Sequence, residues 1–511
     1  MALLLCHMIG NRKFIKTLME RKRCMEWKKL LTQERLSEER EDPPAFNDYY
    51  ISPFERDYER IVSSAAFRRL QDKTQVFPLS KSDFVRTRLT HSMEVSTIAK
   101  QLGIMCFQNT SSYQNLPIDP DEEGNEELKA KRVGDIEAIL SCAGLLHDLG
   151  NPPFGHVGED IIREWFESNL ESGKLSSGSN GKLVRDILNK EMIDDLLNFE
   201  GNAQALRILL KARHQSEINL PFSIISALIK YPTKSDEVGE LIIRHKIGCY
   251  QAEKDTFAEI ANKVGTAREE RVIRHPLAYL VEAADDIAYM TADLEDAVKS
   301  GVVSVDELLS FFKLNYEKLG EEHNESQQHI MRTKEIIDEL DSLNSDEKDK
   351  TKVMSQWSTY LRKWLMYVTC WRFSKSYESI LSGTFDEDLF HDNNHSLTAR
   401  LLRKAMKEYV FGSRVIVEPE VSAQTIISFL LDKFIPAMIR FDSEGLTNQD
   451  RNIITLISEN YINDYFKAKE NDGITDEAEL LYSRILVATD FISGMTDGYA
   501  KTLYKKMSGI E

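Results

Sequence analysis

The sequence predicts an all-α protein made of long amphipathic helices. Three observations lead to this prediction. Only 13 prolines and 24 glycines occur among 511 residues, long stretches are rich in Leu, Ile, Ala, Glu and Lys, and apolar residues recur at helical steps of three and four. Hydrophobic residues make up 42% of the chain, which is enough for a sizeable core and argues against general disorder.

Charge and cysteine usage exclude several classes of protein. The chain has 65 Lys and Arg against 83 Asp and Glu, a net charge of −18, so its surface as a whole would repel nucleic acid. A local basic pocket for a polyanion remains compatible with this charge. The six cysteines form no CxxC pair, which indicates reduced thiols in a cytoplasmic protein. No apolar run approaches the roughly 20 residues that span a bilayer, so we expect no membrane partner.

The chain divides into three predicted parts. Residues 1–24 pair a short apolar run with basic residues but lack the longer apolar region of a signal peptide, so we expect a disordered extension. Residues 25–300 are expected to form a helical core, and 301–511 a helical C-terminal region. A polar stretch with prolines and a glycine at 108–133 predicts an exposed loop, and the highly charged segment 320–350 predicts a solvated helix.

The first segment that carries chemistry is 86–95, RTRLTHSMEV. His91 opens a predicted helix, and a lone histidine in such a place is more often structural than a ligand. The apolar stripe of this helix lies at helical spacing and consists of Val95, Ile98, Ala99, Leu102 and Met105.

The second segment is 141–159, where an apolar helix ends in His147 and Asp148. An adjacent imidazole and carboxylate can ligate one divalent cation, and among leucines an unpaired carboxylate would be costly. A His-Asp pair is nevertheless common by chance. Downstream, His156 and Glu159 would be neighbours on a helix, either as a catalytic pair or as a helix-capping network.

The third segment is 277–297, LAYLVEAADDIAYMTADLEDA. A helical wheel places Asp285 roughly 100° from the centre of the apolar stripe, where it is partly buried, and Asp286 about 160° away, facing solvent or a partner. Tyr289 and Asp293 follow at i+4 and i+8, near the side of Asp285. Without the other two segments, an acidic solvated face would be the default interpretation.

Taken together, two separate histidines, a His-Asp pair and a later Asp resemble the H…HD…D ligand order of the HD phosphohydrolase superfamily. Six blocks further resemble the bacterial deoxyguanosine triphosphate triphosphohydrolases. They are 86–95, AGLLHDLGNPPFGHVGE at 143–159, FEGNAQALRIL at 199–209, IKYP at 229–232, YLVEAADDIAYMTADLEDA at 279–297, and ISGMTD at 492–497. The clearest departure is Ile247, where that family often carries Phe.

The resemblance implies an HD-domain helical core at 25–300 and a C-terminal region that completes the active site and makes oligomer contacts. It implies His91, His147, Asp148 and Asp285 as metal ligands. Mg²⁺ or Mn²⁺ is the expected cofactor, with Co²⁺, Fe²⁺ or Zn²⁺ as alternatives, because such a cation polarises a phosphoryl group and activates water. His156 and Glu159 would form the catalytic pair, and His156 could act as base or as acid.

The implied reaction is attack of water on the α-phosphorus of a deoxynucleoside triphosphate, with dGTP the likeliest substrate, which releases deoxynucleoside and inorganic triphosphate. The implied substrate-binding residues are Gln75, Arg88, Asn202, Lys230, Tyr231, Lys246, Tyr289, Asp293 and Arg484. Tyr289 would pack against the deoxyribose and exclude a 2′-hydroxyl. For Arg484, a salt bridge away from the substrate is an equally good interpretation.

Two other functions remain open from the sequence. One is a nucleotidase or phosphodiesterase of the same superfamily, and the other is a nucleotide- or single-stranded-DNA-binding regulator built on the same scaffold. By resemblance we also expect a homo-oligomer, with a hexamer as the favoured form, and a single-stranded DNA or dNTP effector.

Overall fold

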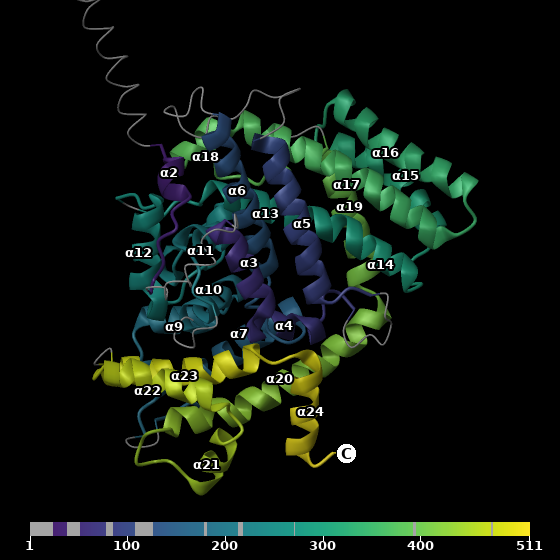
Figure 1. The fold of residues 1–511 in the computed structure, drawn as a ribbon. Helices are drawn as coiled ribbons and strands as arrows, with labels where there is room; N and C mark the ends of the chain where they lie inside the picture. The colour runs from purple at the N-terminus through teal and green to yellow at the C-terminus, as the bar shows by residue number, and fades with distance from the viewer. Residues whose placement is uncertain are drawn as a thin grey trace, which may run out of the picture.

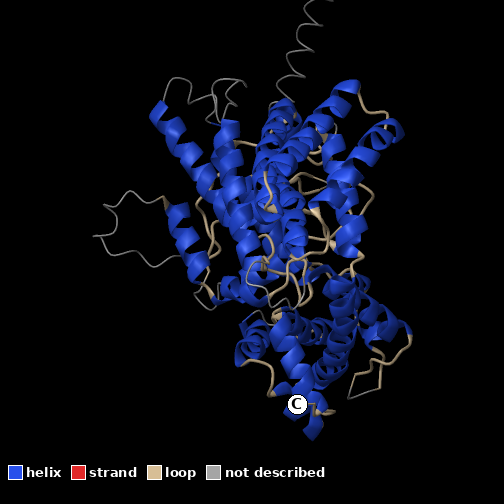
Figure 2. Ribbon diagram, turned by 90° about the vertical axis from the view of Figure 1, so that its right-hand side faces the viewer, coloured by secondary structure: helices blue, strands red, loops and turns tan. Residues whose placement is uncertain are grey.

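The computed structural model (Figure 1) describes residues 24–37, 52–77, 85–107, 126–177, 181–212, 218–269, 271–391, 395–471 and 474–510. Every regular element in these ranges is a helix, and extended pairing is limited to isolated bridges (Figure 2). The predicted all-α class is therefore confirmed. Residues 1–23 of the predicted extension and 108–125 of the predicted loop lie outside the described residues.

The first half of the chain supplies the N-terminal helices and the helices around the site. Its α-helices are α2 (Trp27–Leu30), α3 (Pro53–Ser63), α4 (Ala65–Arg68), α5 (Arg88–Phe107), α6 (Glu126–Leu146), α7 (Gly155–Glu171), α8 (Val184–Ile187), α9 (Lys190–Leu197), α10 (Gly201–Ala212), α11 (Phe222–Leu228), α12 (Lys254–Val264), α13 (Pro276–Ala288) and α14 (Leu294–Lys299). Short 3-10 turns are η2 (Arg69–Asp72), η5 (Ser235–Glu237), η6 (Ile242–Arg244) and η7 (Gln251–Glu253), and η8 (Tyr289–Asp293) is a π-helical turn.

The second half is also helical. The charged segment 320–350, predicted as one solvated helix, instead covers the end of one helix, the whole of a second and the first residue of a third. The helices are α15 (Val305–Glu322), α16 (Gln327–Asp346), α17 (Lys350–Lys375), α18 (Tyr377–Ser382), α19 (Ser396–Ala405), α20 (Arg414–Arg440), α21 (Asn448–Ile454), α22 (Glu459–Asn471), α23 (Glu477–Ser493) and α24 (Asp497–Ser508). A second π-helical turn, η9 (Met406–Phe411), links α19 to α20.

The buried apolar side chains form two clusters. The larger one, which we call the upper core after its place in Figure 1, joins α5, α6 and α13 to α14–α19. The smaller one, the lower core, joins α7–α9 to α20–α24, so a segment from the first half of the chain packs with the C-terminal helices. The helices that carry the predicted metal ligands and the predicted catalytic pair therefore belong to different cores.

The lower core is built around α20. By length and composition this helix could cross a membrane, yet 56% of its most apolar window is buried in the protein. It packs against α7, α21, α23 and α24, as the central helix of a bundle does.

The upper core brings α5 and α6 unusually close together. A Cβ atom on Gly144 of α6 would lie 2.6 Å from the Cα atom of Ser96 on α5, which no larger residue permits. Glycine at this position therefore lets the two backbones touch, and this contact sets the end of α6 beside the start of α5.

A buried ionic cluster joins α10 to α23 between the two cores. Asp490 on α23 is 3% exposed and accepts hydrogen bonds from Arg207 Nε and Gln204 Nε2 of α10, both at 2.8 Å, and Lys211 adds an ion pair. Burial raises the pKa of Asp490, but Arg207 and Lys211 outweigh burial and lower it to about 2 from an ordinary value of 3.8.

We expect Asp490→Asn to lower the free energy of unfolding by about 3 kcal/mol at neutral pH, because it removes one of the two carboxylates that pair with the buried Arg207 and the carboxylate that pairs with Lys211. The folded-state pKa is depressed, so the charge of Asp490 stabilises the fold above about pH 4, and this contribution is lost as the pH falls towards about 2. Urea unfolding of wild type and variant between neutral pH and about pH 3 measures the difference, which should shrink in acid. A difference independent of pH would contradict the ionic origin of the stabilisation.

Candidate functional site

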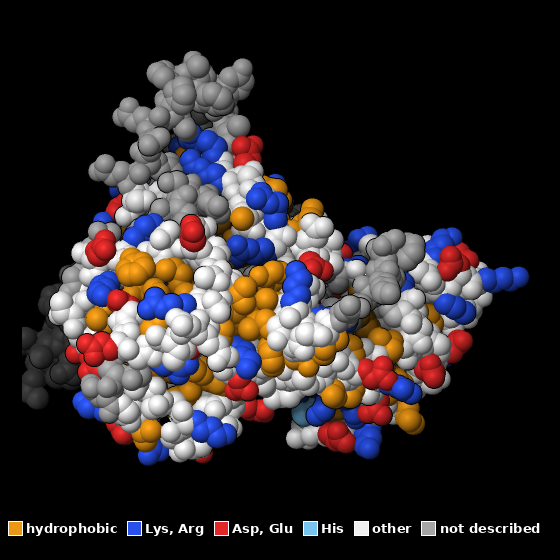
Figure 3. All heavy atoms as spheres, turned by 90° about the horizontal axis from the view of Figure 1, so that it is seen from below, with side chains coloured by type: hydrophobic (Ala, Val, Ile, Leu, Met, Phe, Trp, Pro, Cys, Tyr) orange, Lys and Arg blue, Asp and Glu red, His pale blue; other side chains and the backbone are white. Residues whose placement is uncertain are grey.

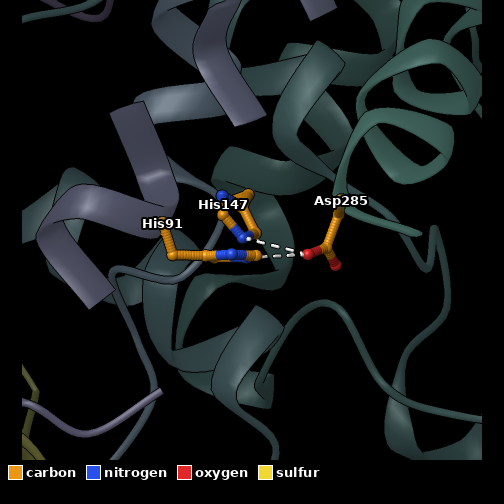
Figure 4. Close-up of side chains that lie close together, drawn as sticks. All are labelled: His91, His147 and Asp285. Atoms are coloured by element: carbon orange, nitrogen blue, oxygen red, sulfur yellow. Dashed lines mark hydrogen bonds and ion pairs between the residues drawn. The ribbon is translucent and has the colours of Figure 1, made fainter. Parts of the chain in front are cut away.

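Three predicted metal ligands meet between the upper-core helices. His91 in the first turn of α5, His147 just after α6 and Asp285 on α13 offer ligand atoms that all lie within 4.8 Å of one another (Figure 4). Asp285 Oδ1 lies 3.1 Å from His91 Nε2 and 3.5 Å from His147 Nε2. Residues far apart in the sequence thus converge on one point.

These donors fit a divalent cation. The Nδ1–H of His147 donates to the carbonyl oxygen of Gly144 at 2.8 Å, so a neutral ring presents the Nε2 lone pair to Asp285. This Nε2 atom is buried and has no hydrogen-bond partner among the described residues. Two imidazoles and a carboxylate, with a second carboxylate beside them, suit Mn²⁺, Fe²⁺, Co²⁺ or Zn²⁺, and the carboxylates suit Mg²⁺.

The pKa values of Asp285 and His147 also support a site for a divalent cation. Burial raises the pKa of Asp285, but His147 and His91 outweigh burial and hold it well below its usual range. Burial lowers the pKa of His147, but Asp148 and Asp285 outweigh burial and raise it to about 9. The carboxylates therefore require positive charge close by, which protons on the imidazoles or a bound cation can supply.

Asp148, the fourth predicted ligand, lies beside the three. Its Oδ2 atom is 3.5 Å from His147 Nε2 and accepts a hydrogen bond from Arg88 at 2.6 Å, while the Asn151 amide donates to Oδ1. Burial raises the pKa of Asp148, but Arg88 and His147 outweigh it and lower it to about 2. The carboxylate is thus ionised and held in place, and its role as a ligand stays a prediction.

The predicted contrast in burial between Asp285 and Asp286 is wrong. Their side chains are 30% and 26% exposed, and Asp286 forms an ion pair with Arg403 of α19 at 2.8 Å. The helical wheel gives the direction of each side chain correctly, since only Asp285 points at the histidines. The wheel could not show that α19, more than 100 residues later in the chain, covers the side of α13 on which Asp286 lies.

The predicted catalytic pair, His156 and Glu159, is joined by a hydrogen bond at the start of α7. His156 Nδ1 lies 2.9 Å from Glu159 Oε2, and Glu159 Oε1 accepts the backbone N–H of Gly201 at 2.8 Å. The His156 side chain is 76% exposed whereas that of Glu159 is 1% exposed. The hydrogen bond that His156 Nδ1–H donates to Glu159 raises the pKa of His156. Because the side chain is exposed, its Nε2 can exchange a proton.

The backbone before α7 places the start of this helix against Arg88. Phe154 has φ of 63°, in the left-handed region that a non-glycine residue rarely adopts, and Gly155 follows with φ of 62°. A Cβ atom on Gly155 would lie 2.5 Å from the Arg88 guanidinium, which itself binds Asp148. Arg88 therefore spans from the predicted metal ligands to the first residue of α7.

Two of the predicted phosphate-binding lysines are held by buried carboxylates. Lys230 Nζ lies 3.6 Å from Glu282 and over the Tyr231 ring at 5.7 Å. Lys246 Nζ lies 3.0 Å from Glu200, which also accepts a hydrogen bond from Asn202 at 2.8 Å. For both lysines, burial lowers the pKa but the carboxylate partner outweighs it and raises the pKa, so both are charged.

The residues predicted to contact the sugar include two unpaired polar atoms. The amide oxygen of Gln75 and one carboxylate oxygen of Asp293 are buried and have no hydrogen-bond partner in the described part of the chain. Burial and the nearby Asp296 raise the pKa of Asp293 well above its ordinary value, which favours the protonated acid, the form that can donate a hydrogen bond. Tyr289 and Asp293 both lie in the π-helical turn η8, a type of turn frequent at functional sites.

The sequence did not predict two residues that contact Asp286 and Tyr289. Arg403 reaches Asp286, as described above, and the ring of Phe411 in η9 lies nearly parallel to that of Tyr289, with 13° between planes and 6.2 Å between centroids. Phe411 is 41% exposed. No motif marked either residue, and only the packing of α19 and η9 against α13 and η8 reveals them.

Arg484 is not brought to this site. Its guanidinium donates to the carbonyl oxygen of Phe441 at the end of α20 and lies near Asp442 and Tyr465, so its contacts belong to the lower core. Of the two interpretations the sequence allowed, the interhelical one fits. Ile247, the departure from the family pattern, is also a packing residue, since it is 1% exposed in the lower core.

Comparison with known proteins agrees with this geometry. The HD domain family matches residues 88–290, the span that contains all four predicted metal ligands. A deoxyguanosinetriphosphate triphosphohydrolase-like protein of Listeria monocytogenes is 42% identical over 496 residues, covering 95% of this chain and 100% of the relative. One of Pseudomonas aeruginosa is 32% identical over 496 residues, covering 95% and 99%. The deoxyguanosinetriphosphate triphosphohydrolase of Yersinia enterocolitica is 29% identical over 509 residues, covering 91% and 96%. The chain therefore belongs to the HD-domain family of deoxyguanosinetriphosphate triphosphohydrolase-like proteins.

Proposed function

We propose that this protein hydrolyses a deoxynucleoside triphosphate, with dGTP as the favoured substrate, to the deoxynucleoside and inorganic triphosphate. The observation that carries the proposal is the convergence of His91, His147 and Asp285 beside a His156–Glu159 pair. The names of the relatives support this substrate, and base specificity comes from them alone.

His91, His147, Asp148 and Asp285 would hold a divalent cation, and we propose Mn²⁺ or Mg²⁺. When bound, such a cation polarises a phosphoryl oxygen and lowers the pKa of water. The described residues contribute the rest of the phosphate site. Arg88, Lys230, Lys246 and Arg403 surround it, and each already pairs with a carboxylate, so the triphosphate would be recognised by groups held in fixed positions.

His156 would move the proton in the reaction. Oxygen of water bonds to the α-phosphorus, and the bond from this phosphorus to the 5′-oxygen breaks. The 5′-oxygen takes a proton from His156, and the attacking water releases a proton to the solvent, from which His156 is protonated again. Since Glu159 raises the pKa of His156, the ring is favoured in its protonated form, and we propose that its Nε2–H donates this proton. Buried and ionised, Glu159 fixes the tautomer through Nδ1.

Gln75, Tyr289 and Asp293 would recognise the deoxyribose. An unpaired amide oxygen can accept a hydrogen bond from a hydroxyl group, and a carboxyl group can donate one when it is protonated, the form that burial favours for Asp293. The Tyr289 ring, backed by Phe411, would leave no room for a 2′-hydroxyl and so reject ribonucleotides.

Product analysis tests the proposal directly. The full chain is incubated separately with dGTP, the other three dNTPs and GTP, in Mn²⁺, in Mg²⁺ and in EDTA, and the products are separated by ion-exchange chromatography. We expect deoxynucleoside and triphosphate in equal amounts, dependent on the cation, and little reaction with GTP. Pyrophosphate or orthophosphate as the first product would instead support a phosphodiesterase or nucleotidase.

We also propose that the chain acts in the cytoplasm as a homo-oligomer, for which a hexamer is the first candidate. The five described cysteines form no disulfide with one another. Hydrophobic side chains gather on the face seen from below (Figure 3), and the first half of α20 exposes Val415, Val417 and Val421. Light scattering coupled to size exclusion tests the oligomer. Single-stranded DNA and an activating dNTP stay predictions from the family resemblance.

A further inference from the structure

A buried carboxylate joins two segments next to the site. Asp497, the first residue of α24, is 2% exposed. Its Oδ1 accepts the backbone N–H of Phe154 at 2.9 Å, and its Oδ2 accepts the backbone N–H of Thr74 at 3.0 Å as well as the Thr74 hydroxyl. Both oxygens of one side chain are therefore used to hold two segments that are far away in the sequence.

A buried lysine makes a parallel connection. Lys73 is 3% exposed, and its Nζ donates to the carbonyl oxygens of Asn151 at 2.6 Å and Ser493 at 2.9 Å. Burial and the nearby Arg88 lower the pKa of Lys73 to about 7, and Asp497 acts in the opposite direction. The segments 73–74, 151–154 and 493–497 thus form one polar junction.

Each of these segments leads to a residue of the proposed reaction. Thr74 precedes Gln75, and the Asn151 amide binds Asp148. Phe154 stands two residues before His156, in a left-handed conformation that costs on the order of 1–3 kcal/mol and persists only where the surroundings enforce it. The hydrogen bond from its N–H to Asp497 is such an enforcing contact.

The junction also bridges the two cores. His91, His147 and Asp285 belong to upper-core helices, whereas His156 lies on α7, whose apolar face packs in the lower core with α20. The distance between the proposed acid and the proposed cation therefore depends on how the two cores are fixed to each other at segment 151–154.

We infer that Asp497, assisted by Lys73, is a positioning residue that keeps His156 and Gln75 at a fixed distance from the metal ligands. This role rests on the proposed function. Asp497 touches no predicted metal ligand and acts through the backbone of Phe154 and Thr74.

The direct test is Asp497→Asn, which keeps the size of the side chain but removes one acceptor oxygen. We expect kcat for dGTP to fall roughly 10- to 100-fold, because a displacement of about 1 Å can cost this much. KM should change much less than kcat, and the affinity for Mn²⁺, measured by electron paramagnetic resonance, should stay unchanged. A loss of fold would lower Mn²⁺ affinity and kcat together.

Asp450→Asn is the matched control. Asp450 is also 2% exposed, and its Oδ2 accepts the backbone N–H and the hydroxyl of Thr447 at 3.0 and 2.7 Å. Both of its oxygens also accept hydrogen bonds from Arg440, but all these contacts lie in the lower core at α20 and α21. We expect it to leave kcat within about twofold of wild type, since a lost hydrogen bond there displaces no residue of the site. A second pair of variants tests the hydroxyl of Thr74. Thr74→Val removes the hydroxyl and should lower kcat, whereas Thr74→Ser keeps it and should retain the wild-type kcat.

Hydrogen–deuterium exchange gives a readout that needs no activity. Peptides covering 151–158 should exchange faster in Asp497→Asn than in wild type and stay unchanged in Asp450→Asn. Unchanged exchange, a kcat within twofold of wild type, or an equal loss of kcat in both Asn variants would overturn the inference. Should Asp497→Asn not fold, equal kcat values for the Thr74 pair would overturn it as well. If the wild-type chain releases no triphosphate, the proposed function is contradicted, and not the positioning role of Asp497.

Discussion

Asp285→Ala is expected to remove Mn²⁺ binding and turnover together, whereas Asp286→Ala removes neither Mn²⁺ binding nor the fold. Asp285 Oδ1 approaches both His91 Nε2, at 3.1 Å, and His147 Nε2, at 3.5 Å. Loss of the cation removes several kcal/mol of transition-state stabilisation, which corresponds to about a thousandfold or more in kcat. Asp286 points at Arg403, so its loss can weaken substrate binding but leaves the ligand atoms in place.

Two measurements on the same preparations check this prediction. Mn²⁺ titration by electron paramagnetic resonance gives the affinity, and chromatography of released triphosphate gives kcat and KM. Circular dichroism confirms that both variants retain their helices. Mn²⁺ binding that survives Asp285→Ala, or that disappears in Asp286→Ala, would refute the assignment of the metal centre.

His156→Ala should lower kcat by about 10²- to 10⁴-fold, the usual contribution of a proton donor, while Mn²⁺ binding persists. The pH profile distinguishes the proposed acid from a base. An acid must carry its proton, so kcat should fall as the pH rises through the pKa of His156. Since the hydrogen bond that the Glu159 carboxylate accepts from His156 raises that pKa, Glu159→Gln should shift this alkaline decline to lower pH.

The outcome can contradict the prediction in two ways. A wild-type kcat that increases with pH over the same range would make His156 a base. An unchanged pH profile in Glu159→Gln would mean that Glu159 only anchors the backbone N–H of Gly201.

The sequence was sufficient for the elements that carry the site but not for their assembly. The stripe on α5 is buried at Val95, Ile98, Ala99 and Leu102 as its spacing predicts, and α6 ends at Leu146, immediately before the His-Asp pair. These features are local, since helical periodicity and helix termination depend on neighbours in the chain.

What the sequence could not predict depends on contacts between distant segments. The close approach of α5 and α6 needs Gly144 to meet the backbone of Ser96, which no spacing reveals. Arg403 and Phe411 became visible only when α19 and η9 were placed against α13 and η8. The resemblance implied Arg484 as a substrate-binding residue because it precedes the ISGMTD block, with a salt bridge as the alternative, and its guanidinium binds the end of α20.

The π-helical turn η8 makes the site sensitive to the deletion of a residue within 289–293. In a straight α-helix, a residue eight positions after Asp285 is rotated by about 80° from it. The wider turn at 289–293 rotates each residue by less and brings Asp293 back towards the face of Asp285. Removing one residue there would repair the α-helical hydrogen bonding. It would also swing Asp293 aside and turn α14, with Glu295 and Asp296, off Arg86, so a gain in helical regularity would cost the sugar-binding side of the site.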